Sequence, residues 1–498
     1  MDRAAEPPPI DLSTLASTTP GARCTGDALV ERLTYDSRDV RPGDLYVALP
    51  GIRHDGHRFV DEAYGRGAVA AVVGHVVDVP LEQVVVPSVR RAVGPMAAAF
   101  YGYPAERMRV IGVTGTNGKT TVCSLLRQCL EEAAVPAGQI GTVGNYVRNQ
   151  VLPTTLTTPQ AVDLQRTLWQ MAEAGTEVVA MEASSHGLDQ HRVDGVTFDV
   201  GVFTNLSREH LDYHRSMEAY FSAKARLFEP GRARTGVMGV DDAWGRRLAH
   251  AATIPVLTVG HGDADVGIRK VEDHGLAGIG VELVGALGPV RLRSPLIGSF
   301  NASNVAMAYV VARHLGVDEE SAAAGIARAG PAPGRVELVD AGQPFLVLVD
   351  YAHTPDALRA VLETARRLAN PRTGRVSLVL GARGGRDRGK RPETGSVAVA
   401  GADLVVLTAD NPGDEPVGST IADLLAGIPA HRRDRVSVIP DRSEAIDQVV
   451  SRASPGDVVL VVGRGHETTY RIGAEVRTLD DRAAARQTAL RWTADLCG

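Results

Sequence analysis

The sequence predicts an α/β protein of several domains, with parallel sheets in its two larger units. Two observations lead to this prediction. The chain has 498 residues, which is more than a single hydrophobic core usually serves. Short apolar segments also alternate with helical patterns, and many of these segments end in a polar loop, as strands of parallel sheets do. The composition, 44% hydrophobic and 22% charged, is that of a globular protein with substantial cores.

Charge, hydropathy and cysteine usage argue against several classes of protein. A net charge of −6 and a pI near 6.2 argue against a general nucleic-acid binder. No apolar run reaches membrane-spanning length, and the start MDRAAEPPPIDL lacks the basic and apolar regions of a signal peptide. Cys24, Cys123, Cys129 and Cys497 form no CxxC pair and no metal-ligand spacing. We therefore expect a reduced, cytoplasmic protein without a membrane or nucleic-acid partner.

The first unit is expected to span residues 1–105. Residues 44–49 and 68–73 have the length and composition of buried strands. The unit ends near Tyr103 and Pro104, just before the next apolar strand.

A phosphate-binding loop is predicted at residues 112–121, GVTGTNGKTT, between a strand at 109–113 and a helical pattern. Gly115 and Gly118 allow the backbone to turn its N–H groups toward an anion, and the helix N-terminus adds positive potential. Lys119 can reach terminal phosphates, and the Thr120 hydroxyl can ligate Mg²⁺. The alternative is a glycine-rich turn with a solvated lysine. The strand, turn, GKT and helix occur together, which favours the phosphate loop.

The central unit is expected to span residues 106–331, with further strands at 177–182 and 200–204 and a final helix that ends near residue 329. The segment AGPAPGR at 329–335 resembles a linker.

Polar side chains follow the strand at 177–182. Glu182 could hold Mg²⁺, because hard cations prefer carboxylate oxygen. Ser184, Gln190 and Arg192 offer donors that suit an anionic substrate. For any one of these residues alone, an ordinary polar loop is the better explanation.

Other segments of the central unit allow two interpretations each. In TNLSREHLDYH, Glu209, His210, Asp212 and His214 could take a metal or form a charged surface, and neither HExxH nor a nearby cysteine suggests zinc. Lys224 lies in a predicted helix, where an exposed lysine is the usual explanation. Asn301 and Asn304 share a helix face and could contact a base or cap the helix.

The third unit is expected to span residues 332–498 and repeats a strand followed by a polar loop. Strands at 345–349, 376–380, 404–407 and 458–462 precede DYAHTPDAL, GARGGRDRGKRP, TADNPGDEP and GRGHETTY. Ligands bind at the carboxyl ends of parallel strands. These loops therefore favour a two-substrate enzyme with an interdomain cleft over a nucleotide switch.

Motifs along essentially the whole chain resemble the Mur ligase family of ATP-dependent amide-bond-forming enzymes. GTNGKTT, EASSHGL, FTNLSREHLDYH, YFSAKARLF, GSFNASN, PGRVE and VDYAHTPDAL occur in that family's order. The segment at 35–56, TLTTPQA at 155–161, DNPG and GRGHE are most similar to the branch that adds the third residue to UDP-N-acetylmuramoyl-L-Ala-D-Glu. The resemblance implies a UDP-substrate domain, a central P-loop ATPase domain and a C-terminal Rossmann-like domain.

The resemblance also implies a reaction that uses ATP and Mg²⁺. The γ-carboxylate of D-Glu would attack the γ-phosphate of ATP to give an acyl phosphate. The amine of the incoming amino acid would attack that carbonyl, and the tetrahedral intermediate would collapse to the amide and phosphate. Catalysis of this kind depends on positioning and charge neutralisation.

Roles for individual residues follow from the resemblance alone. Lys119, Glu182, His210 and Lys224 would be catalytic. One Mg²⁺ would bind through Thr120 and Glu182, and a second would sit near His210 and a carbamylated Lys224. ATP would contact Gly115, Thr116, Asn117, Gly118, Lys119, Thr120, Thr121, Asn301, Asn304, Arg335 and Asp350. The UDP-linked substrate would contact Ser37, Thr157, Thr158, Ser184, Gln190 and Arg192. The amino acid would contact Arg391, Asp410, Asn411, Gly413, Gly463 and Glu467.

Position 413 is the main departure from the family pattern. Members that add diaminopimelate carry DNPR, whose arginine grips the substrate's carboxylate, whereas this chain has Gly413. Loss of such a charge pair removes about 2–5 kcal/mol of discrimination. Arg383 or Arg386 could replace the arginine, the substrate could be lysine or another amino acid without a distal carboxylate, or the protein could serve a specialised peptide pathway. A Gly413→Arg change is expected to raise the use of diaminopimelate relative to lysine.

Other functions remain open at this point. The leading hypothesis is a monomeric ligase of cell-wall precursor synthesis. One alternative is an amide synthase that acts on a different acceptor in a specialised metabolite pathway. Another is a P-loop regulatory protein that hydrolyses ATP without ligation. Retention of the residues expected to hold the UDP-linked substrate favours the first.

Overall fold

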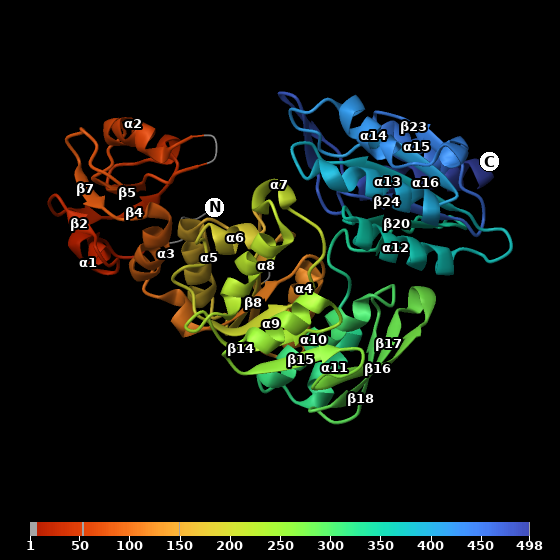
Figure 1. Ribbon diagram of the computed structural model, residues 1–498, viewed down its shortest axis with the longest axis horizontal. Coiled ribbons are helices and arrows are strands. Elements are labelled where there is room, and N and C mark those ends of the chain that lie inside the picture. Colours follow the sequence, from red (N-terminus) through yellow and green to blue (C-terminus); the bar gives the residue numbers. More distant parts are fainter. Residues whose placement is uncertain (1–6, 52–53, 149, 498) are drawn as a thin grey trace.

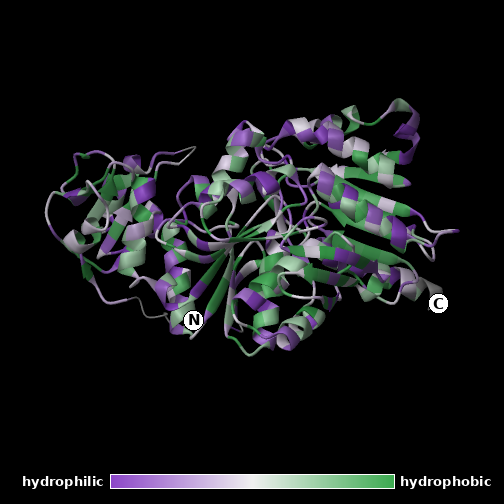
Figure 2. Ribbon diagram, turned by 60° about the horizontal axis from the view of Figure 1, so that its bottom comes forward, coloured by the Kyte–Doolittle hydropathy of each residue, from purple (hydrophilic) through white to green (hydrophobic). Residues whose placement is uncertain are grey.

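The computed structural model describes residues 7–51, 54–148 and 150–497, and each unit has its own sheet. Figure 1 shows a smaller N-terminal unit beside a central unit, with the C-terminal unit lying against the other side of the central one. Figure 2 shows that the strands of the central and C-terminal sheets are mainly hydrophobic, while hydrophilic residues concentrate on the surrounding helices and loops. The predicted α/β class is confirmed.

The N-terminal sheet has the strand order β2-β7-β6-β5-β4, parallel except where β2 joins β7. Its strands are β2 (Arg23–Cys24), β4 (Arg32–Thr34), β5 (Asp44–Val47), β6 (Ala70–Val73) and β7 (Glu82–Val85). The helices of this unit are α1 (Leu12–Ser17), α2 (Val60–Gly65) and α3 (Val89–Phe100), and β1 (Ile10–Asp11) pairs with β3 (Leu29–Val30).

The central sheet has the order β11-β10-β9-β12-β8-β13-β14-β15-β16-β17-β18, and its middle, from β9 to β16, is parallel. Antiparallel strands extend it at both edges. The parallel strands are β8 (Arg109–Thr114), β9 (Ala137–Gly141), β12 (Val178–Glu182), β13 (Phe198–Phe203), β14 (Ala233–Gly239), β15 (Val256–Gly260) and β16 (Val266–Asp273). The edge strands are β10 (Gly144–Val147), β11 (Gln150–Leu152), β17 (Ile279–Gly285) and β18 (Val290–Ser294).

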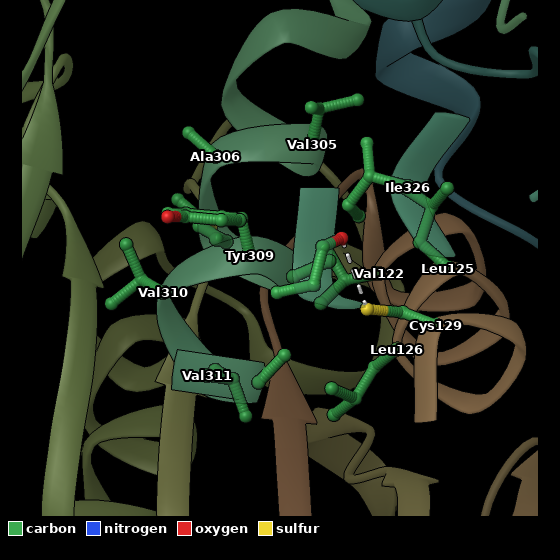
Figure 3. Close-up of a cluster of buried hydrophobic side chains, with 14 of the residues drawn as sticks. Val122, Leu125, Leu126, Cys129, Val305, Ala306, Tyr309, Val310, Val311 and Ile326 are labelled. Carbon is green, nitrogen blue, oxygen red and sulfur yellow. Dashed lines mark hydrogen bonds between the residues drawn. The ribbon is translucent and has the colours of Figure 1, made fainter. Parts of the chain in front are cut away.

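The described part of the central unit contains eight α-helices, and the longer ones bury apolar side chains against the sheet, among them Leu126, Leu168 and Val310. The helices are α4 (Lys119–Glu132), α5 (Ala161–Glu173), α6 (Ser185–Asp189), α7 (Leu211–His214), α8 (Met217–Ala225), α9 (Ala243–Ala251), α10 (Asn301–His314) and α11 (Glu319–Arg328). Figure 3 shows the contact between α4, α10 and α11, where Leu126, Tyr309 and Ile326 are fully buried. The Cys129 thiol donates to the Ala322 carbonyl across it at 3.5 Å. This core anchors the helix that follows the predicted phosphate loop.

The C-terminal sheet has the order β19-β20-β24-β21-β22-β23 and is parallel except at β19. Its strands are β19 (Glu337–Leu338), β20 (Leu346–Asp350), β21 (Val376–Ala382), β22 (Leu404–Ala409), β23 (Val436–Val438) and β24 (Val458–Val462). The helices are α12 (Pro355–Leu368), α13 (Arg391–Gly401), α14 (Val417–Ala426), α15 (Arg442–Ser451) and α16 (Asp481–Cys497). A hairpin of β25 (Thr469–Ile472) and β26 (Glu475–Thr478) precedes the last helix.

Strand order brings the polar loops together. In the central sheet β12, β8 and β13 are neighbours, and in the C-terminal sheet β20, β24, β21 and β22 are neighbours. The loops that follow neighbouring parallel strands emerge at the same edge of a sheet. Among the described residues, no helix is long and apolar enough to cross a membrane.

Candidate active site

Loops of the central and C-terminal units line one cavity of about 2350 Å³. This volume exceeds the roughly 300–1,000 Å³ of a site for one small ligand, so several ligands fit side by side. The cavity is lined by the loops after β8, β12 and β13, by the start of α10, and by the loops after β20, β21, β22 and β24. The four polar loops predicted in the third unit all contribute to it.

The predicted phosphate loop joins β8 to α4. Gly115 has φ +146° and Gly118 has φ +91°, conformations that side chains rarely adopt. A Cβ on Gly118 would lie 2.3 Å from Asn304 Oδ1, so the loop also requires the absence of a side chain there. The helix N-terminus that follows is open to the cavity, because residues 116–121 line it. The loop geometry therefore suits an anion at the start of α4.

Two lysines meet at one carbonyl of this loop. Lys119 Nζ donates to Gly115 O at 2.9 Å, and Lys224 Nζ donates to the same oxygen at 2.7 Å. Lys224 is 1% exposed and its Nζ lies 4.6 Å from the centre of the Tyr220 ring. Burial, together with the charge of Lys119, holds the pKa of Lys224 well below its ordinary value. The alternative of an exposed helix lysine is therefore wrong for Lys224.

Glu182 lies beside the phosphate loop, because β12 is the neighbour of β8. Its Oε1 accepts from Thr120 Oγ1 at 3.0 Å and from Thr142 N at 2.8 Å. Thr120 Oγ1 also accepts from Arg335 Nη2 at 3.0 Å. The linker at 329–335 thus brings an arginine into the phosphate site.

His210 is the residue just before α7, on the loop after β13, with φ +57°. Burial lowers its pKa to about 2, so the ring is neutral at physiological pH. Its Nδ1 atom is buried and has no hydrogen-bond partner within the described part of the chain. A neutral imidazole with an unpaired nitrogen is suited to ligate a cation. In residues 7–51, 54–148 and 150–497, however, no three His, Cys, Asp or Glu side chains converge to form a complete metal site.

Ion pairs join the central and C-terminal units across the cavity. Glu209 accepts from Lys390 Nζ at 2.7 Å and lies 3.5 Å from His353 Nε2. Burial alone would raise the pKa of Glu209, but His353 and Lys390 hold it below its ordinary value. Arg208 pairs in the same way with Asp387 at 3.1 Å. These contacts hold the two units together around the cavity.

The residues expected to hold the UDP-linked substrate fall into two groups. Thr157, Thr158, Ser184, Gln190 and Arg192 all line the cavity. Arg192 donates to Thr158 O at 2.9 Å and to Gln190 Oε1 at 2.7 Å, which orients this group. Ser37 lies in the N-terminal unit, away from the cavity lining, and its hydroxyl donates to Glu62 at 3.0 Å. Its expected role stays a prediction.

The further residues expected to contact ATP come from α10 and from the C-terminal unit. Asn304 Nδ2 donates to Asn301 Oδ1 at 3.0 Å, so the two amides share one helix face as predicted. Asp350 accepts from Val336 N at 2.8 Å, and burial raises its pKa. Asn301, Asn304, Arg335 and Asp350 all line the cavity.

Two buried carboxylates, Asp410 and Glu467, line the part of the cavity formed by the C-terminal unit. Asp410 is 1% exposed, and its Oδ1 has no hydrogen-bond partner among the residues described. Glu467 accepts from Arg383 at 2.6 Å and from Tyr351 at 3.1 Å, and its Oε2 is likewise unpaired there. Buried carboxylate oxygens without a donor suit an ammonium group.

The other residues expected to hold the amino acid surround these carboxylates. Arg391 pairs with Glu415 and Asp423 at 2.7 and 2.9 Å. Asn411 and Gly413 line the cavity. Gly463 lies behind it, where a Cβ would come within 2.7 Å of Asp410 Oδ2.

Several residues that line the cavity were not predicted as site residues from the sequence. His353 and Lys390 lie in recognised motifs but received no role, and Glu209 was considered only as a metal ligand or surface charge, since nothing local shows that the three meet across two units. Arg471 lies in β25, in a segment without a motif. Only the pairing of this hairpin with a distant loop places it at the cavity, so no sequence signal could have found it.

The comparisons with known proteins agree over the whole length. The family model described as the Mur ligase middle domain matches residues 113–312, the glutamate ligase domain model matches 334–465, and the catalytic domain model matches 29–101. The 2,6-diaminopimelate ligase for UDP-N-acetylmuramoyl-L-alanyl-D-glutamate from Streptomyces coelicolor is 44% identical over 491 residues, 96% of each chain. The ligase of the same name from Geobacillus thermodenitrificans is 41% identical over 485 residues, 95% of this chain and 98% of that one.

Solved structures are also similar. A structure of a ligase with the same name is 34% identical, with a TM-score of 0.65 over 94% of this chain and 96% of that one. MurF ligase from Thermotoga maritima in complex with ADP shares the fold at 20% identity, with a TM-score of 0.63 over 93% of this chain and 97% of the other.

Proposed function

Since this chain belongs to the Mur ligase family, we propose that it joins an amino acid to the D-Glu of UDP-N-acetylmuramoyl-L-Ala-D-Glu in peptidoglycan precursor synthesis. The reaction is an ATP-dependent amide-bond formation that yields ADP and phosphate. The observation that carries this proposal is the shared cavity, which joins the phosphate loop of the central unit to two carboxylates of the C-terminal unit that each keep one oxygen without a hydrogen-bond partner among the described residues. A nucleotide switch would need the phosphate loop but not the carboxylates of the C-terminal unit.

The phosphate loop would act on the terminal phosphate of ATP. Its backbone N–H groups and Lys119 would neutralise charge on the phosphoryl group while the γ-carboxylate of D-Glu attacks it. Arg335, already 3.0 Å from Thr120, would add a cation from the other unit. The product of this step is an acyl phosphate.

The unpaired oxygens of Asp410 and Glu467 would receive the ammonium end of the incoming amino acid. The remaining proposed contacts are Arg391, Asn411, Gly413 and Gly463. This ammonium would lose a proton to solvent, and the neutral amine would attack the carbonyl of the acyl phosphate. The tetrahedral intermediate would lose a second proton and collapse to the amide and phosphate. Holding both reactants in one cavity replaces a bimolecular encounter with a positioned one.

Thr120 and Glu182 would hold one Mg²⁺, and His210 and Lys224 would hold a second; both would neutralise phosphate charge. The unpaired Nδ1 of His210 and the oxygens of Glu182 fit this task, and Mg²⁺ usually completes its shell with waters and substrate phosphates. An ammonium at Lys224 would repel the ion. The low pKa of Lys224 favours its neutral amine, the form that reacts with CO₂ to give a carbamate.

The UDP-linked substrate would extend from the cavity toward the N-terminal unit. Thr157, Thr158, Ser184, Gln190 and Arg192 would hold its sugar-peptide part, and Ser37 its uridine diphosphate end. The domains would be residues 1–105, 106–331 and 332–498, binding UDP-substrate, ATP and amino acid respectively. We propose a cytoplasmic monomer; Cys24, Cys123 and Cys129, the cysteines whose side chains the structure describes, are free thiols.

An acceptor comparison tests this function. Purified protein with ATP, Mg²⁺ and diaminopimelate is expected to release phosphate with UDP-N-acetylmuramoyl-L-Ala-D-Glu, but not with UDP-N-acetylmuramoyl-L-Ala, which lacks the attacking γ-carboxylate. Equal phosphate release with both acceptors, or with none, would favour an ATPase that ligates nothing. A folded protein that accepts neither compound would favour the amide synthase with a different acceptor.

A further inference from the structure

We propose that Arg471 supplies the cation that grips the distal carboxylate of a diamino dicarboxylic acid, in place of an arginine at position 413. This inference rests on the proposed function and specifies which residue selects its amino-acid substrate. Arg471 lies on β25 and lines the cavity, as do Gly413 and Asp414.

The hairpin that carries Arg471 is docked on the DNPG loop by backbone hydrogen bonds. Gly413 N donates to Arg471 O at 2.9 Å, and Gly473 N donates to Gly413 O at 2.6 Å. The Asn411 side chain accepts from Arg471 N at 3.1 Å. Gly413 and Ile472 form a parallel bridge there. The position of residue 471 is therefore fixed relative to the loop that would otherwise supply the arginine.

The Arg471 guanidinium lies in the space next to residue 413. A Cβ built on Gly413 would be 3.2 Å from Arg471 Nη2, and Gly413 has φ +60°. The glycine thus leaves room for a guanidinium that arrives from the facing strand. The Arg471 guanidinium can occupy this place because residue 413 has no side chain.

The other arginines near this end of the cavity already pair with carboxylates of the protein that are less exposed than Asp414. Arg383 donates to Glu467 at 2.6 Å, and Arg391 is clamped between Glu415 and Asp423. Arg386 faces the central unit, 4.0 Å from Asp212. The sequence alone left Arg383 and Arg386 as candidates, and their contacts in the structure favour Arg471 instead.

Arg471 can exchange its present partner for a substrate. Its Nη1 donates to Asp414 Oδ1 at 2.5 Å and to Gly473 O at 2.7 Å. Asp414 is exposed, with 64% of its side chain accessible. Exposed ion pairs of this kind contribute little to stability. A substrate carboxylate can therefore replace Asp414 as the partner of Arg471 at a small cost in free energy. Diaminopimelate carries such a carboxylate, whereas L-lysine lacks it.

The test compares diaminopimelate with L-lysine as substrates of the full-length protein, with UDP-N-acetylmuramoyl-L-Ala-D-Glu and ATP present. The Arg471→Gln variant is expected to raise KM for diaminopimelate by about 10- to 100-fold, the effect of removing a charged hydrogen bond. Its KM for lysine and its kcat with saturating diaminopimelate should stay within a few-fold of wild type. Arg471→Lys should recover part of the diaminopimelate affinity.

Arg477→Gln is the matched control. Arg477 lies on β26 of the same hairpin, pairs with Glu475 and is absent from the cavity lining. Its kinetics should equal those of wild type, and the thermal midpoints of both variants should agree with the parent. If Arg471→Gln leaves KM for diaminopimelate unchanged, or raises both KM values equally, the inference is wrong.

Gly413→Arg gives a second, independent check. The added side chain would push on Arg471, so we expect poorer use of diaminopimelate, the reverse of the expectation from sequence alone. Improved use would overturn the inference. A wild-type protein that prefers lysine would overturn it while leaving the ligase function intact, whereas a protein that ligates no amino acid would overturn both.

Discussion

Lys224 combines deep burial with a position shared with Lys119 on one carbonyl oxygen. Two ammonium groups bound to the same oxygen would repel each other. The low pKa of Lys224 favours its neutral form, which removes that repulsion. Replacing Lys224 with Met keeps most of its volume but removes the group that can become a metal-binding carbamate. We expect kcat for ligation to fall by about 100-fold or more, as for loss of other charge-stabilising groups, with KM for ATP within a few-fold. Steady-state kinetics measure both.

Lys270→Met is the matched control for this variant. Lys270 lies on β16, pairs with Glu272 at 2.6 Å and is 61% exposed. Its replacement should leave kcat unchanged. Full activity in the Lys224 variant would remove Lys224 from the mechanism.

His186 links the site to the pH dependence of stability. Burial, with smaller contributions from the charges of Arg386 and Arg192, lowers its pKa to about 4. Below pH 6.5 the unfolded chain binds a proton that the folded ring does not, so stability falls as pH drops from about 6.5 toward 4. For His186 alone this loss is about 2 kcal/mol at pH 5.

Urea unfolding at pH 7 and pH 5 measures this loss. A His186→Asn variant should lose less free energy of unfolding than wild type between the two pH values. An equal loss in both proteins would mean that His186 is not held neutral in the fold.

At the scale of elements, the start of α4 depends on two glycine conformations. Gly118 has φ +91°, and a Cβ there would meet Asn304 Oδ1 at 2.3 Å. Gly118→Ala should therefore disturb the phosphate loop and weaken ATP binding by about tenfold or more, in addition to a backbone strain of about 1 kcal/mol. Calorimetric titration with ATP measures the affinity.

Gly316→Ala separates strain from crowding. Gly316 has the same φ of +91° but nothing within 4 Å of a built Cβ. This variant should show the strain alone, with unchanged ATP affinity. Equal ATP affinities for the two variants would contradict the role assigned to the Gly118 contact.

The sequence could predict elements whose signal is local. The strand at 458–462 agrees with β24, and the strand, loop and helix around Lys119 agree with β8 and α4. The expected strand at 44–49 is shorter in the structure, because β5 ends at Val47. The antiparallel strands that extend the central sheet were not predicted.

The burial of Lys224 and the position of Arg471 could not be predicted from the sequence, because both depend on long-range contacts. The burial of Lys224 depends on packing against Tyr220 and the phosphate loop. The sequence of its own helix gives no sign of this burial. Arg471 reaches the cavity through a bridge to Gly413, a residue far away in the chain. Neither contact leaves a periodic pattern.

At the scale of the whole molecule, the Glu209–Lys390 pair joins two units around the reaction space. An acyl phosphate in an open cavity would hydrolyse, so contacts that keep water out should couple phosphate release to ligation. Lys390→Met would leave Glu209 buried without its closest ion-pair partner and loosen this contact. We expect the ratio of phosphate released to amide formed to rise above one.

Arg366→Met is a suitable control, since Arg366 pairs with Asp403 within the C-terminal unit at 2.8 Å. Its ratio should remain one. A ratio of one in the Lys390 variant as well would show that this ion pair does not protect the intermediate.

The ligase function itself is tested most directly by the product. Wild-type protein is incubated with ATP, Mg²⁺, UDP-N-acetylmuramoyl-L-Ala-D-Glu and either diaminopimelate or lysine, and product mass and phosphate are recorded together. We predict one new amide per phosphate released, formed preferentially with diaminopimelate. Phosphate release without an amide product of either amino acid, from folded protein that binds ATP, would contradict the account.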